Sequence, residues 1–252
     1  MLHVYCNVFN VIFRLGFLNL ASFHTMNSNF VVFGGTIIYS MNISTGQCVK
    51  LLDAKISLNS LDFTANGRYL FIGDQQGGLG MFRTDANLSN LTKIRRFLIA
   101  PNTRISNISV CSIERAFYVL ISTNESLMLF AVTDPSKSSA PIIKMINRWS
   151  IRTQTLKTEP ISSPMGHNGH TFFDIRAEFC PLSIIHDQIA STLSIVSGSK
   201  SGSVLFFTSK CDQPFNALQG HERGVLAATF NYDESLLATS DENGVVIIWK
   251  RQ

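Results

Sequence analysis

The chain has 252 residues, of which 45% are hydrophobic and 15% charged, and its formal net charge is +4. This length is enough to bury a substantial core. The cations are scattered and densest at Lys93, Arg95 and Arg96, so no basic stripe indicates direct nucleic-acid binding. The five cysteines are odd in number, widely spaced and form no C-x-x-C pair, which argues against a disulfide framework or a cysteine-rich zinc site and is typical of a reducing compartment.

The N-terminal stretch raises the question of membrane insertion. "MLHVYCNVFNVIFRLGFLNLASF" is apolar enough for a secretory signal or a membrane anchor, but Asn7, Asn10 and Arg14 interrupt it. An arginine near the bilayer centre costs about 2.5 to 3.5 kcal/mol on insertion scales, and no positive charge precedes the apolar segment. We leave residues 1–16 unassigned, with spurious gene-model sequence as one interpretation and a membrane-anchored or secreted protein as the alternative.

From residue 17 onward the sequence repeats one pattern in five copies. Each copy has three short apolar runs separated by turn clusters, and the second turn of most copies carries glycine, as in Asn243-Gly244. Runs rich in Val, Ile and Phe predict β-strands. We expect strands at residues 18–23, 30–33 and 36–41 (with an outer strand at 48–52), 58–63, 69–72 and 79–82, 105–110, 116–122 and 127–130, 173–179, 193–198 and 203–207, and 225–230, 236–239 and 245–249.

The spacing of the copies is that of a repeat fold. Their first strands end at Phe23, Phe63, Val110, Phe179 and Phe230. The shortest of these intervals is close to the roughly 40 to 45 residues of a four-stranded propeller blade. The copies therefore predict stacked four-stranded units.

The composition of the remaining segments supports an all-β fold. The unbroken apolar run at 245–249 predicts a strand that is covered on both faces. No stretch has the amphipathic period and caps of a long helix, so neighbouring sheets must cover it. A segment at about 133–170, rich in Ser, Thr and Pro, predicts a long loop. The sequence thus predicts one all-β domain of stacked blades over residues 17–252.

The last copy carries the motifs of a known repeat. The GH at 220–221 resembles the opening of a WD40 repeat, the LATS at 237–240 its second strand, and the IWK at 248–250 its closing I-W-D. The other copies lack both the GH and the tryptophan. This resemblance implies a WD40 β-propeller, a fold in which blades of four strands are arranged around a central channel.

The resemblance also implies a structural hydrogen-bond network within the last blade. Carried over by position, its members are His221, Thr239, Asn243 and Trp249. A buried imidazole and a buried indole N–H each need a partner, which is the physical reason for such a network. Asn243 stands where the family has Asp, and Lys250 replaces the final Asp, so we expect a weakened network.

The number of copies predicts an incomplete ring. Five copies supply at most five blades, whereas propellers of this family usually close with about seven. We favour a fragment or a truncated gene model. The alternatives are a genuine short chain that pairs with another chain, and a compact ring in which residues 2–15 form the closing strand.

Further stretches are similar to one intracellular member of the family: "MNISTGQCVK", "RAEFCPLS", "VSGSKSGSVLFF" and the last repeat. That similarity implies a scaffold of the nucleus and cytoplasm that binds other proteins, with chromatin-regulatory partners such as histone deacetylase complexes. Binding residues usually lie on loops held by a rigid scaffold. The candidate contact residues on loops are Arg104, Arg115, Arg152 and Lys200.

The sequence offers no active site. His167 and His170 lie in a Gly-containing loop without a third ligand type nearby, which favours a polar loop over a zinc site. The glycines at 77–80 lack the spacing and setting of a phosphate loop. A propeller enzyme of the hydrolase type would need converging carboxylates or metal ligands. We therefore expect a non-enzymatic protein with no cofactor, no metal and no small-molecule substrate.

Overall fold

β-Strands provide the regular structure in the computed structural model, which describes residues 20–113, 116–124, 126–136, 141–150, 175–181 and 192–251. The strands are β1 (Leu20–His24), β2 (Asn27–Gly34), β3 (Ile37–Asn42), β4 (Cys48–Asp53), β5 (Leu58–Phe63), β6 (Tyr69–Asp74), β7 (Gly78–Thr84), β8 (Leu91–Leu98), β9 (Ile105–Ile113), β10 (Ala116–Thr123), β11 (Ser126–Thr133), β12 (Ile143–Ser150), β13 (Ala177–Phe179), β14 (Ser194–Gly198), β15 (Ser203–Thr208), β16 (Asn216–Gln219), β17 (Val225–Phe230), β18 (Leu236–Asp241) and β19 (Val246–Lys250).

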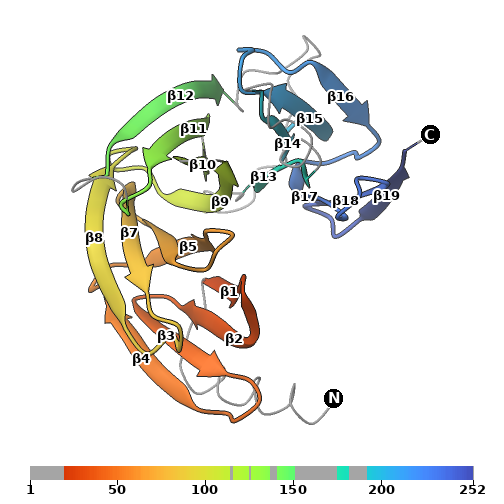
Figure 1. Cartoon of the computed structure of the whole chain (residues 1–252). Helices are drawn as coiled ribbons and strands as arrows, with labels where there is room; N and C mark the ends of the chain where they lie inside the picture. Colours follow the sequence, from red (N-terminus) through yellow and green to blue (C-terminus); the bar gives the residue numbers. More distant parts are fainter. Residues whose placement is uncertain are drawn as a thin grey trace, which may run out of the picture. The chain divides into compact units, whose positions relative to one another are not determined.

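These strands form five sheets, in each of which neighbours along the chain are also hydrogen-bonded neighbours (Figure 1). We name the sheets blade 1 (β1–β4), blade 2 (β5–β8), blade 3 (β9–β12), blade 4 (β13–β16) and blade 5 (β17–β19). Blade 5 has three strands among the described residues, and the other blades have four each. The predicted class, an all-β protein of propeller blades, is confirmed.

The five predicted copies correspond to the five blades. The strand expected at 58–63 coincides with β5 and that at 225–230 with β17, while most other bounds differ by a few residues. Outer strands β8 and β16 were not predicted. Their sequences, LTKIRRFL and NALQ, lack the apolar runs that mark covered strands, because outer strands face solvent along one edge.

The loop predicted at about 133–170 is wrong for residues 143–150, which form β12. The Ser, Thr and Pro around this stretch concealed a strand that is held by a buried tryptophan. Trp149 is 2% exposed and its ring packs on Phe207. Residues 137–140 and 151–174 of the segment, like residues 1–16, lie outside the described residues. Within the described part, no helix is both long and apolar enough to span a membrane.

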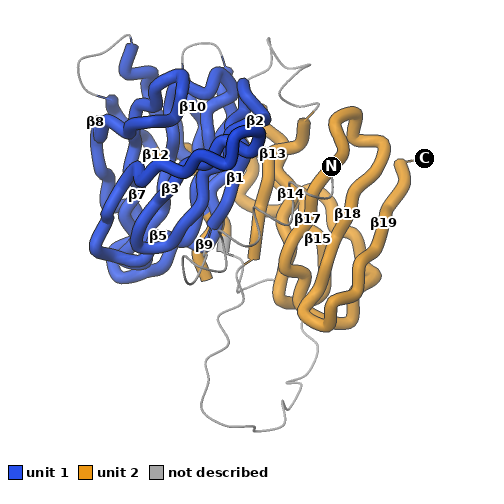
Figure 2. The backbone as a smooth tube through the Cα atoms, turned by 90° about the horizontal axis from the view of Figure 1, so that it is seen from below, with its two compact units in different colours: residues 1–121, 130–144 blue, residues 122–129, 145–252 orange. Residues whose placement is uncertain are grey.

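The chain is divided into two compact units (Figure 2). The first consists of Met1–Ile121 and Phe130–Lys144, and the second of Ser122–Leu129 and Met145–Gln252. Blades 1 and 2 lie in the first unit, and blades 4 and 5 lie in the second. Each unit has its own apolar core.

Leu88, in the loop between β7 and β8, joins blades 1 and 2. Its side chain is fully buried in a cluster with residues of both blades, although its backbone has a left-handed φ of 46°. Asp85 stabilises this conformation by accepting hydrogen bonds from the N–H groups of Ser89 (2.8 Å) and Asn90 (3.0 Å). Ser40 of β3 donates its hydroxyl to the carbonyl oxygen of Leu88 at 2.6 Å. The loop is therefore an inter-blade contact.

Replacing Leu88 by alanine tests this contact. Leu88→Ala should lower the free energy of unfolding by about 2 to 5 kcal/mol, the usual cost of truncating a buried leucine. Leu98→Ala is the matched control on the same blade, because Leu98 is 61% exposed and should lose less than about 1 kcal/mol. Urea unfolding followed by circular dichroism measures both. Equal losses would show that Leu88 makes no inter-blade contact.

Candidate functional site

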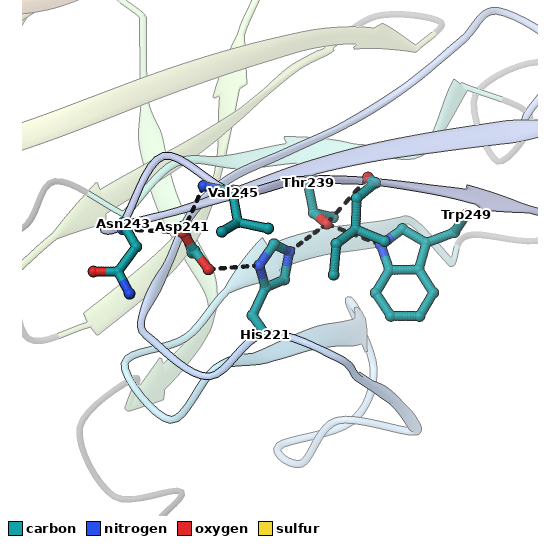
Figure 3. A network of polar contacts seen from close by, with 7 residues as sticks. His221, Thr239, Asp241, Asn243, Val245 and Trp249 are labelled. Atoms are coloured by element: carbon teal, nitrogen blue, oxygen red, sulfur yellow. Dashed lines mark hydrogen bonds and ion pairs between the residues drawn. The ribbon is translucent and has the colours of Figure 1, made fainter.

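The best-defined polar cluster lies in blade 5 (Figure 3). Nδ1 of His221 is 2.9 Å from Oδ2 of Asp241, and Nε2 of His221 is 2.7 Å from Oγ1 of Thr239. The indole N–H of Trp249 donates to the same Oγ1 at 2.8 Å. The side chains of His221 and Asp241 are 0% and 3% exposed, so the cluster is shielded from water.

Its hydrogen bonds form one continuous donor chain that fits a neutral imidazole. The indole of Trp249 donates to Thr239, the hydroxyl of Thr239 donates to Nε2 of His221, and Nδ1–H of His221 donates to Asp241. Each donor then has one short acceptor, and the single imidazole proton lies on the nitrogen that faces the carboxylate. The carboxylate thus fixes the tautomer.

The carboxylate also holds its own hairpin. Oδ1 of Asp241 accepts the backbone N–H groups of Asn243 (3.0 Å) and Val245 (2.9 Å). Burial alone would raise the pKa of Asp241. The hydrogen bond from His221 and those from the N–H groups of Val245 and Asn243 outweigh this effect and lower the pKa below its ordinary value. Asp241 is therefore held in its charged form.

The structure corrects the predicted membership of this network. His221, Thr239 and Trp249 come together as expected, but the acceptor of the imidazole proton is Asp241 and not Asn243. Asn243 takes part in the network only through its backbone N–H and is exposed to solvent. Because Asp241 supplies the carboxylate, the loss of charge expected from Asn243 does not occur. The error came from aligning the turn by its Asn-Gly pair, whereas the carboxylate belongs to the last position of β18.

Gly220 completes the packing around this cluster. A Cβ at Gly220 would lie 2.7 Å from the indole carbon Cη2 of Trp249, closer than any ordinary contact. The glycine of the Gly220-His221 pair therefore lets the backbone approach the tryptophan ring.

Blade 2 has a carboxylate, Asp74, in the position that Asp241 occupies in blade 5, but its side-chain partner is an arginine and not a histidine. Asp74 is the last residue of β6, and its Oδ1 accepts the N–H groups of Gln76 (2.9 Å) and Gly78 (2.8 Å), as Asp241 does in blade 5. Its Oδ2 receives two bonds from Arg96, from Nη2 at 2.6 Å and Nε at 3.0 Å. Gly78 has no side chain to obstruct the Arg96 guanidinium, which a Cβ at that position would meet. An outer-strand arginine thus replaces the histidine.

A shared sequence signal marks these hairpins. Asp74, Ser199 and Asp241 each stand three residues before a turn glycine of left-handed φ: Gly77 (83°), Gly202 (81°) and Gly244 (79°). The pattern [DS]-x-x-G places an acceptor side chain at the end of the second strand and a residue without Cβ where φ is positive. This signal identifies both carboxylates, which are otherwise indistinguishable in the sequence from ordinary acidic turn residues.

Two further carboxylates, which the sequence reasoning missed, join the first strands of neighbouring blades. Asp62, one residue before the end of β5, accepts the N–H of Val110 in β9 at 2.7 Å. Glu178 stands one residue before the end of β13 and accepts the hydroxyl of Thr229 in β17 at 2.8 Å. Burial raises the pKa of Glu178, and the bond from Thr229 and the charge of Arg176 oppose this rise. The signal was an acid directly before the last Phe of a first strand.

The predicted contact residues are only partly described. Arg104 and Lys200 are exposed, before β9 and in the β14–β15 hairpin respectively. Arg115 and Arg152 lie outside the described residues, as do His167 and His170. Across the described ranges no three His, Cys, Asp or Glu side chains come together in a group that could hold a metal ion.

Comparison with known proteins places these features in a class. A sequence model described as "WD domain, G-beta repeat", of the WD40 family, matches residues 212–250, which comprise β16 and all of blade 5. A chain of the "Crystal Structure of Mitotic Checkpoint Complex" superimposes with a TM-score of 0.60 and 15% identity. The match covers 92% of this chain and 61% of that one, and at this identity it shows the fold alone.

The fold is therefore that of WD40 β-propeller blades. Residues 212–250 match the model of a WD40 repeat, and within this segment hydrogen bonds link Trp249 to Thr239, Thr239 to His221 and His221 to Asp241. Because β16 belongs to the sheet of blade 4, the repeat supplies the outer strand of one blade and the inner strands of the next.

Two alanine variants test the corrected membership. Asp241→Ala should lower the unfolding temperature by about 5 °C or more, because it leaves two backbone N–H groups and the imidazole without their acceptor. Asn243→Ala should change it by less than about 1 °C, since that side chain is exposed. Differential scanning calorimetry distinguishes them. A larger loss for Asn243→Ala would restore the original assignment.

The pH dependence of stability offers an independent test. A carboxyl group whose pKa is lower in the folded than in the unfolded state stabilises the protein above its unfolded pKa, and this contribution disappears as the pH falls through the folded value. Asp241 has such a lowered pKa. The stability difference between wild type and Asp241→Asn should therefore be constant near pH 7 and shrink below about pH 4. Urea titrations at a series of pH values measure it, and a difference independent of pH would contradict the assignment.

Proposed function

We propose that this protein is a non-enzymatic scaffold that binds other proteins through the loops at the hairpin ends of its blades. One observation carries the proposal: the most enzyme-like cluster, His221 with Asp241 and Thr239, is buried and uses its polar atoms for internal bonds. A group that is fully engaged and inaccessible cannot act on a substrate. Its role is to fix the hairpin. The exposed loops, held by these rigid blades, are then the surface available for binding.

Charged side chains on these loops are suited to partner recognition. Lys200 and Arg104 are exposed on connections next to the hairpins, and Arg223 lies in the exposed turn before β17. The positive charges of Arg223 and Lys200 act on Glu242, whose pKa is nonetheless raised because its partial burial dominates. This mixture of charges suits a polar protein surface better than a small-molecule pocket.

The class of partner follows from resemblance. The stretches "MNISTGQCVK", "RAEFCPLS" and "VSGSKSGSVLFF" are similar to the C-terminal half of WD-repeat protein 13, which implies the nucleus and cytoplasm and chromatin-regulatory partners such as histone deacetylase complexes. The solved structure to which this chain is similar is that of a protein complex, the Mitotic Checkpoint Complex. This supports a role in binding other proteins. Binding to nucleic acid or to a small-molecule substrate is not part of the proposal.

Affinity capture with paired charge variants tests this function. The tagged full chain should recover specific proteins from nuclear extract, with histone deacetylase subunits among them. The double variant Arg104→Glu with Lys200→Glu should lose at least about tenfold in recovery, since each desolvated contact charge costs on the order of 1 kcal/mol or more.

The control reverses the charge of two exposed lysines away from these loops, Lys210→Glu in the β15–β16 turn with Lys250→Glu at the end of β19, and should retain recovery. Equal loss in both double variants would mean that net charge alone drives capture. Specific partners without deacetylase subunits would remove the chromatin assignment. No specific partner, or recovery of the chain in a glycosylated or membrane fraction, would overturn the scaffold proposal.

A further inference from the structure

The outer strand of blade 2 presents an open edge. β8 is the last strand in the order β5-β6-β7-β8, and no strand of the described residues pairs with its far side. Such an edge exposes a row of backbone N–H and C=O groups that can hydrogen-bond to an additional strand. With eight residues, β8 is long enough to offer several of these bonds.

The edge is cationic. The sequence of β8, LTKIRRFL, contains Lys93, Arg95 and Arg96 and no acidic residue. Arg96 already forms an ion pair with Asp74, so its charge is neutralised within the blade. Lys93 and Arg95 are exposed, and neither takes part in an ion pair among the described residues. Two positive charges therefore remain available on the strand.

These two cations lie on opposite faces of the sheet. Lys93 pairs with Phe82 and Arg95 with Met81, with an irregularity in the register between them. Phe82 packs in the core between blades 1 and 2. Because successive residues of β7 point to opposite faces, Lys93 and Arg95 do so as well. A strand added to this edge would meet one cation on each of its faces.

Arg95 is already fixed in place. Its Nη1 donates to the carbonyl oxygen of Pro141 at 2.9 Å, and its guanidinium lies 5.3 Å from the ring centroid of Phe97. Fixing a long side chain before binding lowers the entropy that binding must offset. Beside it, Ile142 is 63% exposed, and Leu98 at the end of β8 is 61% exposed. Apolar groups thus accompany the charges.

The charge pattern selects the occupant. A second copy of β8 would place Lys93 and Arg95 against the same cations, and like charges on paired strands repel. An acidic extended segment would satisfy both the backbone edge and the charges. We propose that β8 binds an extended, acidic segment of a protein partner as an added fifth strand of blade 2. This inference rests on the scaffold function and assigns it a surface separate from the hairpin loops.

A peptide probe tests the proposal on the full 252-residue chain. The probe is a fluorescent peptide of about ten residues that alternates glutamate with valine or threonine. It should bind in an anisotropy titration, and the variant Lys93→Glu with Arg95→Glu should weaken binding at least about tenfold, equivalent to ~1.4 kcal/mol. Lys93→Glu alone, which leaves the contacts of Arg95 intact, should weaken it by a smaller factor. The control pair Lys55→Glu with Lys250→Glu should change affinity less than about twofold.

A second probe separates strand addition from general attraction. The same peptide with alternate backbone nitrogens methylated keeps its charge but cannot complete a strand ladder, and it should bind at least about tenfold more weakly. Three results would overturn the proposal. The methylated peptide or a single-stranded oligonucleotide could bind as tightly as the unmodified peptide, or the unmodified peptide could bind equally well to the β8 double variant and to the control pair. If the peptide does not bind to β8 but partner proteins are still captured in a way that depends on Arg104 and Lys200, only the proposed β8 surface is wrong. Loss of that capture would instead concern the scaffold function itself.

Discussion

A carboxylate at the end of the second strand organises the hairpins of blades 2 and 5. In both blades one oxygen accepts two backbone N–H groups of the turn, and the other receives a cationic or imidazole partner from elsewhere in the fold. Buried carboxylates are costly unless they are fully hydrogen-bonded. Asp74 and Asp241 meet this condition through four short bonds in blade 2 and three in blade 5, so the turn geometry and the charge stabilise each other.

The partner of that carboxylate differs between the blades, and the difference has a structural cause. In blade 5 His221 comes from the connection before β17 and is fixed by Thr239 and Trp249. In blade 2 Arg96 reaches Asp74 across β7, where Gly78 offers no side chain to obstruct it. The same requirement is thus satisfied by two residue types. A repeat can lose the recognisable GH and tryptophan and still keep its hairpin.

Much of this architecture could be predicted from the sequence. Alternation of apolar runs with turn clusters placed all five blades and most of the three inner strands of each. A strand such as β6 is buried along its whole length and must be apolar. The expectation that the run at 245–249 is covered on both faces is wrong, because Val246 and Ile248 of β19 are 61% and 59% exposed. Of the outer strands, the one expected at 48–52 is confirmed as β4, but β8, β12 and β16 could not be found in the same way. β8 has one open edge, tolerates Lys93 and Arg95, and so carries no apolar signature. β12 is concealed within a polar segment, and only the burial of Trp149 reveals what holds it.

The polar site was predictable in its residue types but not in its register. His221, Thr239 and Trp249 followed from the repeat motif, whereas the carboxylate was placed two residues too late, at Asn243. A two-residue displacement in a turn changes no apolar pattern, so the apolar runs cannot distinguish the two positions, and only the spacing of Asp241 from the turn glycine Gly244 marks the correct one. The inter-blade carboxylates were missed for a related reason: their partners are a backbone N–H and a hydroxyl on another blade, distant in sequence.

Amide hydrogen exchange measured residue by residue tests the central role of the hairpin carboxylates most directly. The N–H groups of Gly78 and Val245 lie at the ends of hairpin turns and donate to Asp74 and Asp241. The account predicts that both exchange at least on the order of a thousandfold more slowly than in an unstructured peptide. Exchange of either amide at the unprotected rate would show that the carboxylate does not hold its hairpin, and would contradict the account.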